Sequence, residues 1–295
     1  MRRRLAAWLA GRTGHPADPA EERERLIRGY VEGGRVAWSA GYKPYRADLL
    51  RRVVRDEAVL KMFRRGDPLP PGFGRGIDER VVEYPWVLSR LEAGAGALFD
   101  AGSTLNFPYL LDLPVLAHKA IVIQTLAPEH IEARPNVSYL FGDLRDLILR
   151  DDLFGTIVCI STLEHIGLDN TRLYTADERF REASAGDYRR ALNELRRVLA
   201  PGGRLLLTVP FGRAESLGWM QQFDAAGVAS IVKAFGAQPV AVTYFRYVDD
   251  GWLRSDAAAC ADAGYFDVHT AAAPAPDGAA AARAVACLEF RKLPG

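Results

Sequence analysis

Polar residues suited to binding and catalysis follow several short apolar runs of this 295-residue sequence. The runs at 97–100, 120–125, 137–142 and 155–161 are rich in aliphatic and β-branched residues and are typical of buried parallel strands. In an open α/β sheet the carboxyl ends of the strands meet at one edge, where ligands bind. The residues that we expect in one site at this edge are Asp100, Gly102, Thr125, Asp143, Ser161, Glu164 and His165.

The first strand end lies in the stretch LFDAGSTLNF (98–107), which is typical of a strand, a tight turn at Gly102 and the start of a helix. Loops of this layout that hold a nucleotide-like cofactor usually contain several glycines. Here Ser103, Thr104 and Asn106 follow a single glycine. A β-branched threonine does not readily adopt left-handed backbone, so the turn must differ locally, and Ser103 or Thr104 can cap the following helix.

The elements that must position these residues are strands alternating with helices from residue 97 onward. The best helix is predicted in DYRRALNELRRVLAPGG (187–203), where apolar residues at helical spacing share one face and Pro-Gly-Gly ends the helix. A strand follows at 204–210, then a helix at 217–235, a strand at 239–248 and a last strand at 284–290 in a hairpin. This series predicts a doubly wound sheet.

Residues 1–94 are helix-rich and predict an N-terminal extension to a second unit at 95–295. The segment IDERVVEYPWVLSRL (77–91) sets apolar residues among charges, which indicates a helix or turn-helix packed on the second unit. Tyr84 and Trp86 lie in this segment, and we expect the extension to act as a lid near the site.

The composition is that of an ordinary globular protein, with 49% hydrophobic and 25% charged residues. A formal net charge of +1 gives no basis for general nucleic-acid binding, so no nucleic-acid partner is expected. The three cysteines form no paired framework and indicate a reducing compartment. We expect a cytoplasmic protein without stable membrane insertion. The start MRRRLAAWLAG has too short an apolar run for a signal peptide, and weak docking to an anionic membrane is the alternative.

Four motifs in order make residues 95–211 similar to the class I S-adenosylmethionine-dependent methyltransferases. The strongest, ALNELRRVLAPGGRLLLTVPFG (191–212), resembles the helix, Pro-Gly-Gly turn and fifth strand of that family. FDAG (99–102), FGDLRDL (141–147) and FGTIVCISTLEHIG (154–167) resemble its first motif, its acidic turn and its fourth-strand motif. The resemblance implies S-adenosyl-L-methionine as cofactor. It also implies a Rossmann-like, doubly wound, mostly parallel seven-stranded sheet with an antiparallel last strand, beside the helical N-terminal extension.

The resemblance assigns residues to the methionine half of the cofactor. Asp100 and the backbone around Gly102 would face its amino-acid end, where a carboxylate accepts from the ammonium and favours the nearby sulfonium. Ser103 is a further candidate contact in this loop. Ser161 would lie beside the transferring methyl group.

The nucleoside half has its own candidates in the resemblance. Asp143 and Leu144 would bind adenine, although Asp143 can also cap its own turn. The family usually has a ribose-binding acid at the end of strand two, and Thr125 stands at that place. A neutral hydroxyl binds more weakly than a carboxylate, and Glu129 can compensate from the next turn.

Glu164 and His165 are the candidate catalytic residues. His165 can act as a general base toward an acceptor hydroxyl or amine, because its unperturbed pKa is about 6.5. A Glu-His pair can also bind a divalent metal, but no further ligand cluster completes such a site, so no metal is expected. The alternative role for the pair is to fix the loop structurally.

The expected activity is methyl transfer to an O or N atom of a small-molecule or glycan-type acceptor. A noncatalytic protein that retains the fold is one alternative, since it would explain the altered glycine loop. A nicotinamide-dependent oxidoreductase is another, but it needs GxGxxG after the first strand, and DAGSTLN lacks that spacing.

Overall fold

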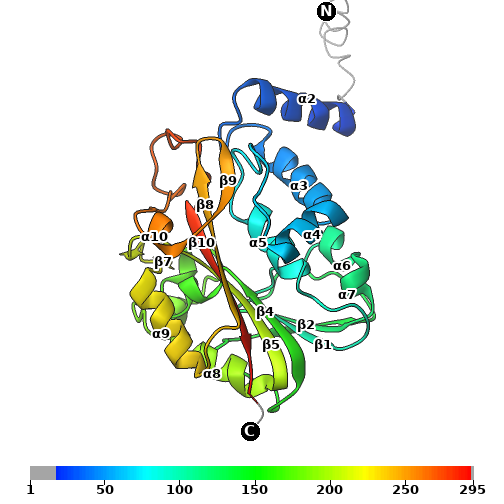
Figure 1. Cartoon of the computed structure of the whole chain (residues 1–295), viewed down its shortest axis with the longest axis vertical. Helices are drawn as coiled ribbons and strands as arrows, with labels where there is room; N and C mark the ends of the chain where they lie inside the picture. The colour runs from blue at the N-terminus through cyan, green and yellow to red at the C-terminus, as the bar shows by residue number, and fades with distance from the viewer. Residues whose placement is uncertain (1–17, 294–295) are drawn as a thin grey trace, which may run out of the picture.

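In the computed structural model, which describes residues 18–293, an eight-stranded sheet runs through the centre of the molecule (Figure 1). Its strands are β1 (Ala97–Ala101), β2 (Ala120–Thr125), β3 (Val137–Phe141), β4 (Phe154–Ile160), β5 (Leu199–Pro210), β8 (Ala241–Val248), β9 (Gly251–Ser255) and β10 (Ala284–Arg291). A separate hairpin is formed by β6 (Glu215–Ser216) and β7 (Gln221–Gln222).

Helices cover the sheet and connect part of it. The longer ones are α2 (Pro19–Glu32), α3 (Tyr42–Val53), α4 (Glu57–Arg65), α5 (Arg80–Leu88), α8 (Tyr188–Val198) and α9 (Ala225–Phe235). The short ones are α6 (Pro108–Leu111), α7 (Pro114–Ala117) and α10 (Ala257–Cys260), with 3₁₀ turns η1 (Leu163–His165), η2 (Asn170–Arg172) and η3 (Glu178–Phe180).

The strand order is β3-β2-β1-β4-β5-β10-β8-β9. The first five strands in this order are parallel, and β10 pairs antiparallel with both β5 and β8. The predicted doubly wound, mostly parallel sheet with an antiparallel last strand is therefore confirmed. The predicted number of seven strands was one too few, because a turn at 249–250 folds the short β9 back along β8. The sequence of β9, GWLRS, has only two adjacent apolar residues, Trp252 and Leu253, and was not recognised as a strand.

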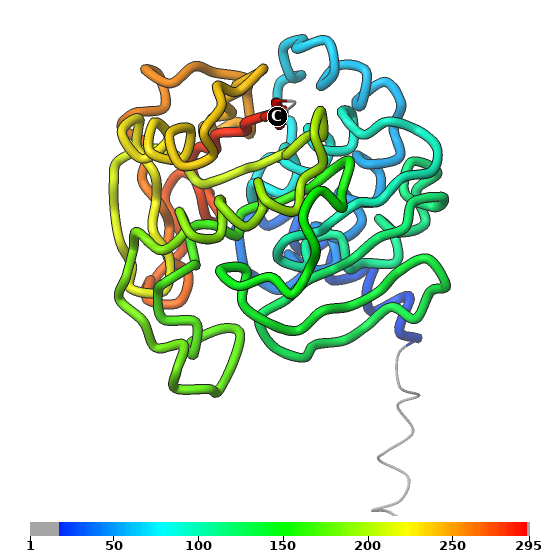
Figure 2. Tube along the Cα trace, turned by 90° about the horizontal axis from the view of Figure 1, so that it is seen from below, coloured from blue at the N-terminus to red at the C-terminus, as the bar shows by residue number. Residues whose placement is uncertain are grey.

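Two hydrophobic cores lie on opposite faces of the sheet, because successive strand residues point to opposite faces. Leu98 belongs to the core shared with α3, α4 and α5, whereas its neighbour Phe99 belongs to the core shared with α8 and α9. Figures 1 and 2 show these two groups of helices on opposite sides of the sheet. The N-terminal segment is thus one of the layers that bury the sheet.

The connections β2–β3 and β3–β4 contain no helix within the described chain. The β2–β3 connection includes Pro128 and Pro135, which disfavour a continuous helix. Helices of the N-terminal segment cover much of the sheet face that such connections would otherwise cover.

The helix predicted at 217–235 begins only at Ala225, which corrects that expectation. Asp224 caps it by accepting a hydrogen bond from the Gly227 backbone N–H at 2.7 Å. The preceding residues form the β6–β7 hairpin instead.

Among the described helices, none is both long and apolar enough to cross a membrane. The basic start of the chain lies outside the described residues. The predictions that it is not a signal peptide, or that it docks weakly to a membrane, therefore stay predictions.

Candidate active site

A cavity of about 300 Å³ opens at the carboxyl ends of β1 to β4. Its lining joins strand ends to the N-terminal helices and to the segment after β4. It includes seven of the nine predicted site residues: Gly102, Ser103, Thr125, Asp143, Leu144, Ser161 and His165. Asp100 and Glu164 are the two predicted residues that do not line it.

Asp100 organises the loop after β1 from within the protein. Its side chain is fully buried and accepts hydrogen bonds from the Thr104 backbone N–H, the Thr104 hydroxyl and the Leu105 backbone N–H, at 3.2, 3.0 and 2.7 Å. Burial raises the pKa of Asp100 to about 6 despite these bonds. Both carboxylate oxygens are therefore engaged by the loop, and direct contact with a ligand stays a prediction.

The single glycine of the loop stands where the backbone requires one. Gly102 has φ +119°, and a Cβ there would lie 2.1 Å from the Thr162 hydroxyl oxygen. The next residue, Ser103, has φ +59°, a left-handed conformation that is tolerated but costs energy outside glycine. The loop therefore uses left-handed backbone at two positions with only one glycine.

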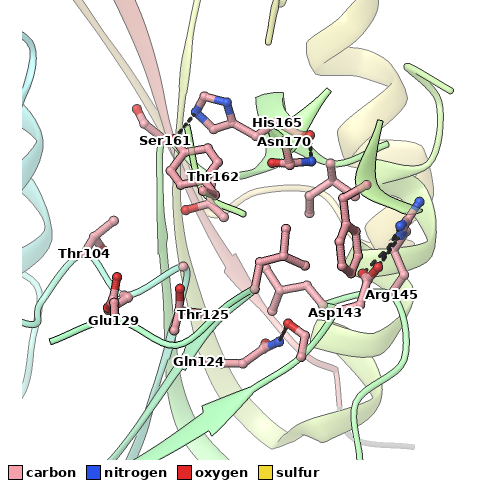
Figure 3. Close-up of a pocket in the computed structure, with 18 of the residues that line it drawn as sticks. Thr104, Gln124, Thr125, Glu129, Asp143, Arg145, Ser161, Thr162, His165 and Asn170 are labelled. Atoms are coloured by element: carbon pink, nitrogen blue, oxygen red, sulfur yellow. Dashed lines mark hydrogen bonds and ion pairs between the residues drawn. The ribbon is translucent and has the colours of Figure 1, made fainter. Parts of the chain in front are cut away.

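The polar residues that replace the later glycines contact Glu129 from the turn after β2. The Ser103 hydroxyl and the Asn106 side-chain amide both donate to its carboxylate, the latter at 3.0 Å. Glu129 and Thr125 both line the cavity. Figure 3 shows Thr104, Thr125 and Glu129 gathered on one side of the cavity. A carboxylate is thus present near the position of the family's ribose acid, held by a different residue.

Gln124 presents an unsatisfied acceptor at the cavity. Its amide nitrogen donates to the Gly142 carbonyl, but its buried Oε1 has no hydrogen-bond partner among the described residues. A buried carbonyl oxygen left unpaired costs free energy. A ligand that donates a hydrogen bond here would remove that cost.

The acidic turn after β3 is built around Arg145. Its guanidinium binds Asp143, Glu182 at 2.9 Å and Asp187 at 2.8 Å. These bonds from Arg145 overcome burial and lower the pKa of Asp143. Figure 3 shows Asp143 and Arg145 paired at the cavity wall. The Asp143 carboxylate is thus fixed at the cavity wall with both oxygens bound to Arg145, and its contact with a ligand stays a prediction.

Ser161 ends β4 in a left-handed conformation, with φ +41°. Its hydroxyl donates to Oε1 of Glu83 on α5 at 2.6 Å, and the Thr208 hydroxyl donates to the same oxygen at 2.6 Å. Glu83 is fully buried and forms an ion pair with Arg80. The N-terminal helix α5 is therefore tied by hydrogen bonds to the ends of β4 and β5.

His165 enters the cavity from η1 as a neutral imidazole. Its Nδ1 lies 3.1 Å from the Trp219 carbonyl oxygen, which can only accept, so Nδ1 carries the proton. Nε2 then accepts from the Tyr174 hydroxyl at 3.3 Å. Burial lowers the pKa of His165 to about 4. The Asn170 amide donates to the His165 carbonyl at 3.1 Å and fixes the turn.

Glu164 points away from the cavity into the protein. Only 2% of it is exposed, and its Oε2 has no hydrogen-bond partner among the described residues. Burial raises the pKa of Glu164 well above its usual range. Within residues 18–293 no cluster of three or more His, Cys, Asp or Glu side chains converges as metal ligands do.

Several cavity residues were missed by sequence reasoning. Those that contribute polar groups are Arg46, Arg80, Gln124, Arg145, Thr162, Asn170 and Tyr174. The signal for Arg80 was present in the segment 77–91, whose charges recur inside an apolar helical run. Arg46 lies on a helix with no distinguishing pattern, so only the tertiary structure brings it to the site.

Residues 118–207 match a family model described as a methyltransferase domain. This range holds β2, β3, β4, α8 and most of β5, and with them Thr125, Asp143 and His165. A comparison with curated protein sequences finds no match.

Solved structures with a similar arrangement include an S-adenosylmethionine-dependent methyltransferase from Mesorhizobium loti, 13% identical, with a TM-score of 0.44 over 71% of this chain and 97% of that one. The N-methyltransferase NodS from Bradyrhizobium japonicum is 13% identical, with a TM-score of 0.41 over 68% of this chain and 88% of its own. The 1,6-didemethyltoxoflavin-N1-methyltransferase of Burkholderia thailandensis is 14% identical, with a TM-score of 0.39 over 95% and 93%. Likenesses this distant decide nothing about the acceptor.

Proposed function

Since this chain carries, at residues 118–207, the methyltransferase domain of an S-adenosylmethionine-dependent enzyme of class I, we propose that it methylates an O or N atom of a small-molecule or glycan-type acceptor. The family and the cofactor, S-adenosylmethionine, are those that the four sequence motifs indicated. The acceptor and the roles of individual residues are proposals.

The observation that carries the proposal is the division of the cavity into two walls. The loops after β1, β2 and β3 form one wall, which includes Ser103, Thr125, Glu129 and Asp143. The segment after β4 forms the facing wall, which includes His165 with its unprotonated Nε2. A cofactor on the first wall and an acceptor at the second would lie within one enclosed space.

The cofactor fits this wall by the chemistry of its donors and acceptors. The backbone around Gly102 would face the amino-acid end, with the Ser103 N–H as the donor, because the Gly102 N–H donates to the Gln124 carbonyl at 2.9 Å. Asp100 braces this loop. The Thr125 hydroxyl and the Glu129 carboxylate would accept from the ribose hydroxyls, and Gln124 Oε1 is a further unpaired acceptor. Asp143 and Leu144 remain the proposed adenine contacts.

When bound, S-adenosylmethionine supplies a methyl group whose bond to sulfur breaks with the electron pair going to sulfur. The protein's part is to align the acceptor atom with that bond and to exclude water, and such alignment can supply about 7–11 kcal/mol. His165 Nε2 accepts the proton that the acceptor loses. The low pKa of His165 keeps this nitrogen unprotonated at neutral pH. For Glu164 we propose the structural role, because its carboxyl group does not reach the cavity.

We propose that the N-terminal segment 1–94 completes the acceptor side through Arg46, Arg80 and Tyr84, which line the cavity. The Tyr84 hydroxyl donates to the Thr104 carbonyl at 3.0 Å. Trp86 is fully buried and does not line the cavity. Opening this segment as a lid would require separation of the core that it shares with the sheet.

The test has two steps. Calorimetry with S-adenosylhomocysteine measures cofactor binding, and incubation with labelled S-adenosylmethionine and a panel of hydroxyl and amine acceptors measures transfer. His165→Gln should retain S-adenosylhomocysteine affinity and lose turnover by about 10²–10⁴-fold, the usual contribution of a general base. Absence of adenosyl-ligand binding at millimolar concentration would overturn the proposal.

A further inference from the structure

Two arginines of the N-terminal segment line the cavity beside the predicted methyl-transfer position. Arg46 lies on α3, and Arg80 is the first residue of α5. Neither belongs to the methyltransferase motifs, and both come from outside the matched range 118–207. They are therefore features of this chain rather than of the domain that binds the cofactor.

Arg46 is anchored through its Nε, and its two terminal guanidinium nitrogens remain available. Its Nε donates to Asp78, which is 6% exposed and also accepts from the Tyr42 hydroxyl at 2.9 Å. Neither terminal guanidinium nitrogen of Arg46 has a hydrogen-bond partner within residues 18–293. Two donor groups on a rigidly held fork thus remain for a ligand.

Arg80 is arranged in the same way. Its Nη1 binds the fully buried Glu83, and its Nε and Nη2 have no partner among residues 18–293. Burial, together with the charge of Arg80, lowers the pKa of His165, and both side chains line the same cavity. Arg80 and His165 therefore belong to one site.

The carboxylates that hold these arginines do not face the cavity, because neither Asp78 nor Glu83 is among its lining residues. Two neighbouring acids have pKa values above the ordinary range of a carboxyl group. Burial and the charge of Asp78 raise the pKa of Glu79 to about 8, and burial raises that of Glu164 well above its usual range.

The acids that do line the cavity have partners of their own. Asp143 and Glu182 bind Arg145, and Glu129 accepts from Ser103 on the cofactor wall. The surface that the N-terminal segment gives to the cavity thus carries cationic donors without an exposed carboxylate from the same segment.

We propose that Arg46 and Arg80 bind an anionic group of the methyl acceptor, a carboxylate or a phosphate. This inference rests on the proposed function. A planar guanidinium matches the paired oxygens of either group, and such charge-assisted bonds are roughly twice as strong as neutral ones. Held at this point, the anionic group positions a hydroxyl or amine of the same acceptor toward His165 Nε2.

The test uses the full-length protein saturated with S-adenosylhomocysteine, so that the cofactor wall is filled. Inorganic phosphate, malonate and glycerol are titrated separately, and binding is followed by calorimetry and by thermal shift. We expect saturable binding of phosphate or malonate and none of glycerol, and the tighter of the two anions identifies the group. Arg46→Gln and Arg80→Gln should each weaken that binding about tenfold or more.

Arg52→Gln is the matched control, because Arg52 is an exposed arginine on the same helix α3 and outside the cavity. It should leave anion binding unchanged. Arg80→Gln leaves Glu83 buried without its cation, so the double variant Arg80→Gln/Glu83→Gln is tested beside it. A folded double variant that binds the anion as tightly as the wild type would overturn the inference, as would wild-type protein that binds neither anion.

A second pair of ligands separates the acceptor from the cofactor. S-adenosylhomocysteine has the amino-acid carboxylate, and 5′-methylthioadenosine lacks it. If the arginine variants lose affinity for the former and keep it for the latter, the guanidiniums hold the cofactor, and the inference fails while the proposed function stands. If the wild type binds neither adenosyl ligand, the proposed function itself fails.

Discussion

Replacement of Gly102 by alanine should destabilise the protein through two separate strains. The backbone at this position has φ +119°, which L-residues rarely adopt. The added Cβ would lie 2.1, 2.6 and 2.9 Å from the Oγ1, Cγ2 and Cβ atoms of Thr162. Both strains fall on the loop that Asp100 organises after β1.

The magnitude is the sum of these two contributions. A residue held in a sparsely populated backbone region costs about 1–3 kcal/mol. Overpacking against Thr162 costs a further 1–3 kcal/mol or so if the neighbouring chain shifts to relieve it. We therefore expect Gly102→Ala to lower the free energy of unfolding by about 2–6 kcal/mol, a large part of the total for a typical domain.

Chemical denaturation of the ligand-free protein measures this change, and calorimetry with S-adenosylhomocysteine measures the effect on the loop. Gly142→Ala is the control, because Gly142 also lines the cavity but a Cβ there meets nothing within 4 Å. The double variant Gly102→Ala/Thr162→Ala removes the contacts with Oγ1 and Cγ2 but keeps the 2.9 Å approach to Cβ. It should therefore recover most of the packing part and keep the backbone part. The reasoning is refuted if Gly102→Ala unfolds with the same free energy as Gly142→Ala.

Three further outcomes are expected. Glu129→Gln should weaken S-adenosylhomocysteine binding about tenfold by calorimetry, since bonds to a charged group contribute about 1.5–3 kcal/mol, while the free energy of unfolding changes little at this exposed position. Arg145→Gln should lower the free energy of unfolding by roughly 2–3 kcal/mol at pH 7, because three carboxylates lose their cation. The pKa of Asp143 is lowered in the folded protein, so this carboxylate contributes fully to the free energy of unfolding above its unfolded pKa of 3.8. The contribution is lost as the pH falls through the lower folded pKa. The free energy of unfolding of Arg145→Gln should therefore depend less on pH in this acid range than that of the wild type. The pKa of His165, about 4 when folded and 6.5 when unfolded, means that the unfolded chain binds more protons between these values. Stability should therefore fall as the pH drops from 6.5 to 4, and His165→Gln should remove that part of the slope in denaturation series at each pH.

Local sequence patterns were enough to find most strands and the main helix of the sheet. The runs at β1, β2, β4 and β5 are largely apolar on both faces, as strands covered on both sides must be, and α8 has apolar residues at helical spacing. The strand β3 was also found, although the prediction that it is buried was wrong: it lies at the edge of the sheet and has no buried residue. The strand β9 was missed because it has only two adjacent apolar residues, and the hairpin β6–β7 was missed because its strands are only two residues long. The start of helix α9 was predicted too early, because the apolar residues before Asp224 outweighed the N-cap signal of this residue.

Some features of the candidate site could likewise be predicted from local sequence order, whereas others depend on contacts between distant segments. Seven of the nine predicted binding and catalytic residues line the cavity, because each lies close behind the end of a strand: Gly102, Ser103, Thr125, Asp143, Leu144, Ser161 and His165. The burial of the Asp100 and Glu164 side chains could not be predicted from the sequence, because a carboxylate in a turn can face a ligand or its own loop. Glu129 was recognised as a candidate from its place after β2, and its bonds to Ser103 and Asn106 appeared only with the fold.

The sequence by itself determined the methyltransferase domain and the edge of the sheet where the cavity lies, because short-range order fixes which residues end each strand. Only the tertiary structure decided what faces those strand ends. Arg46 and Arg80 reach the cavity because α3 and α5 pack on the sheet, and Glu83 on α5 meets Ser161, which lies 78 positions further along the chain. Contacts across such a separation depend on how whole layers pack, and no local pattern of residue types records that packing.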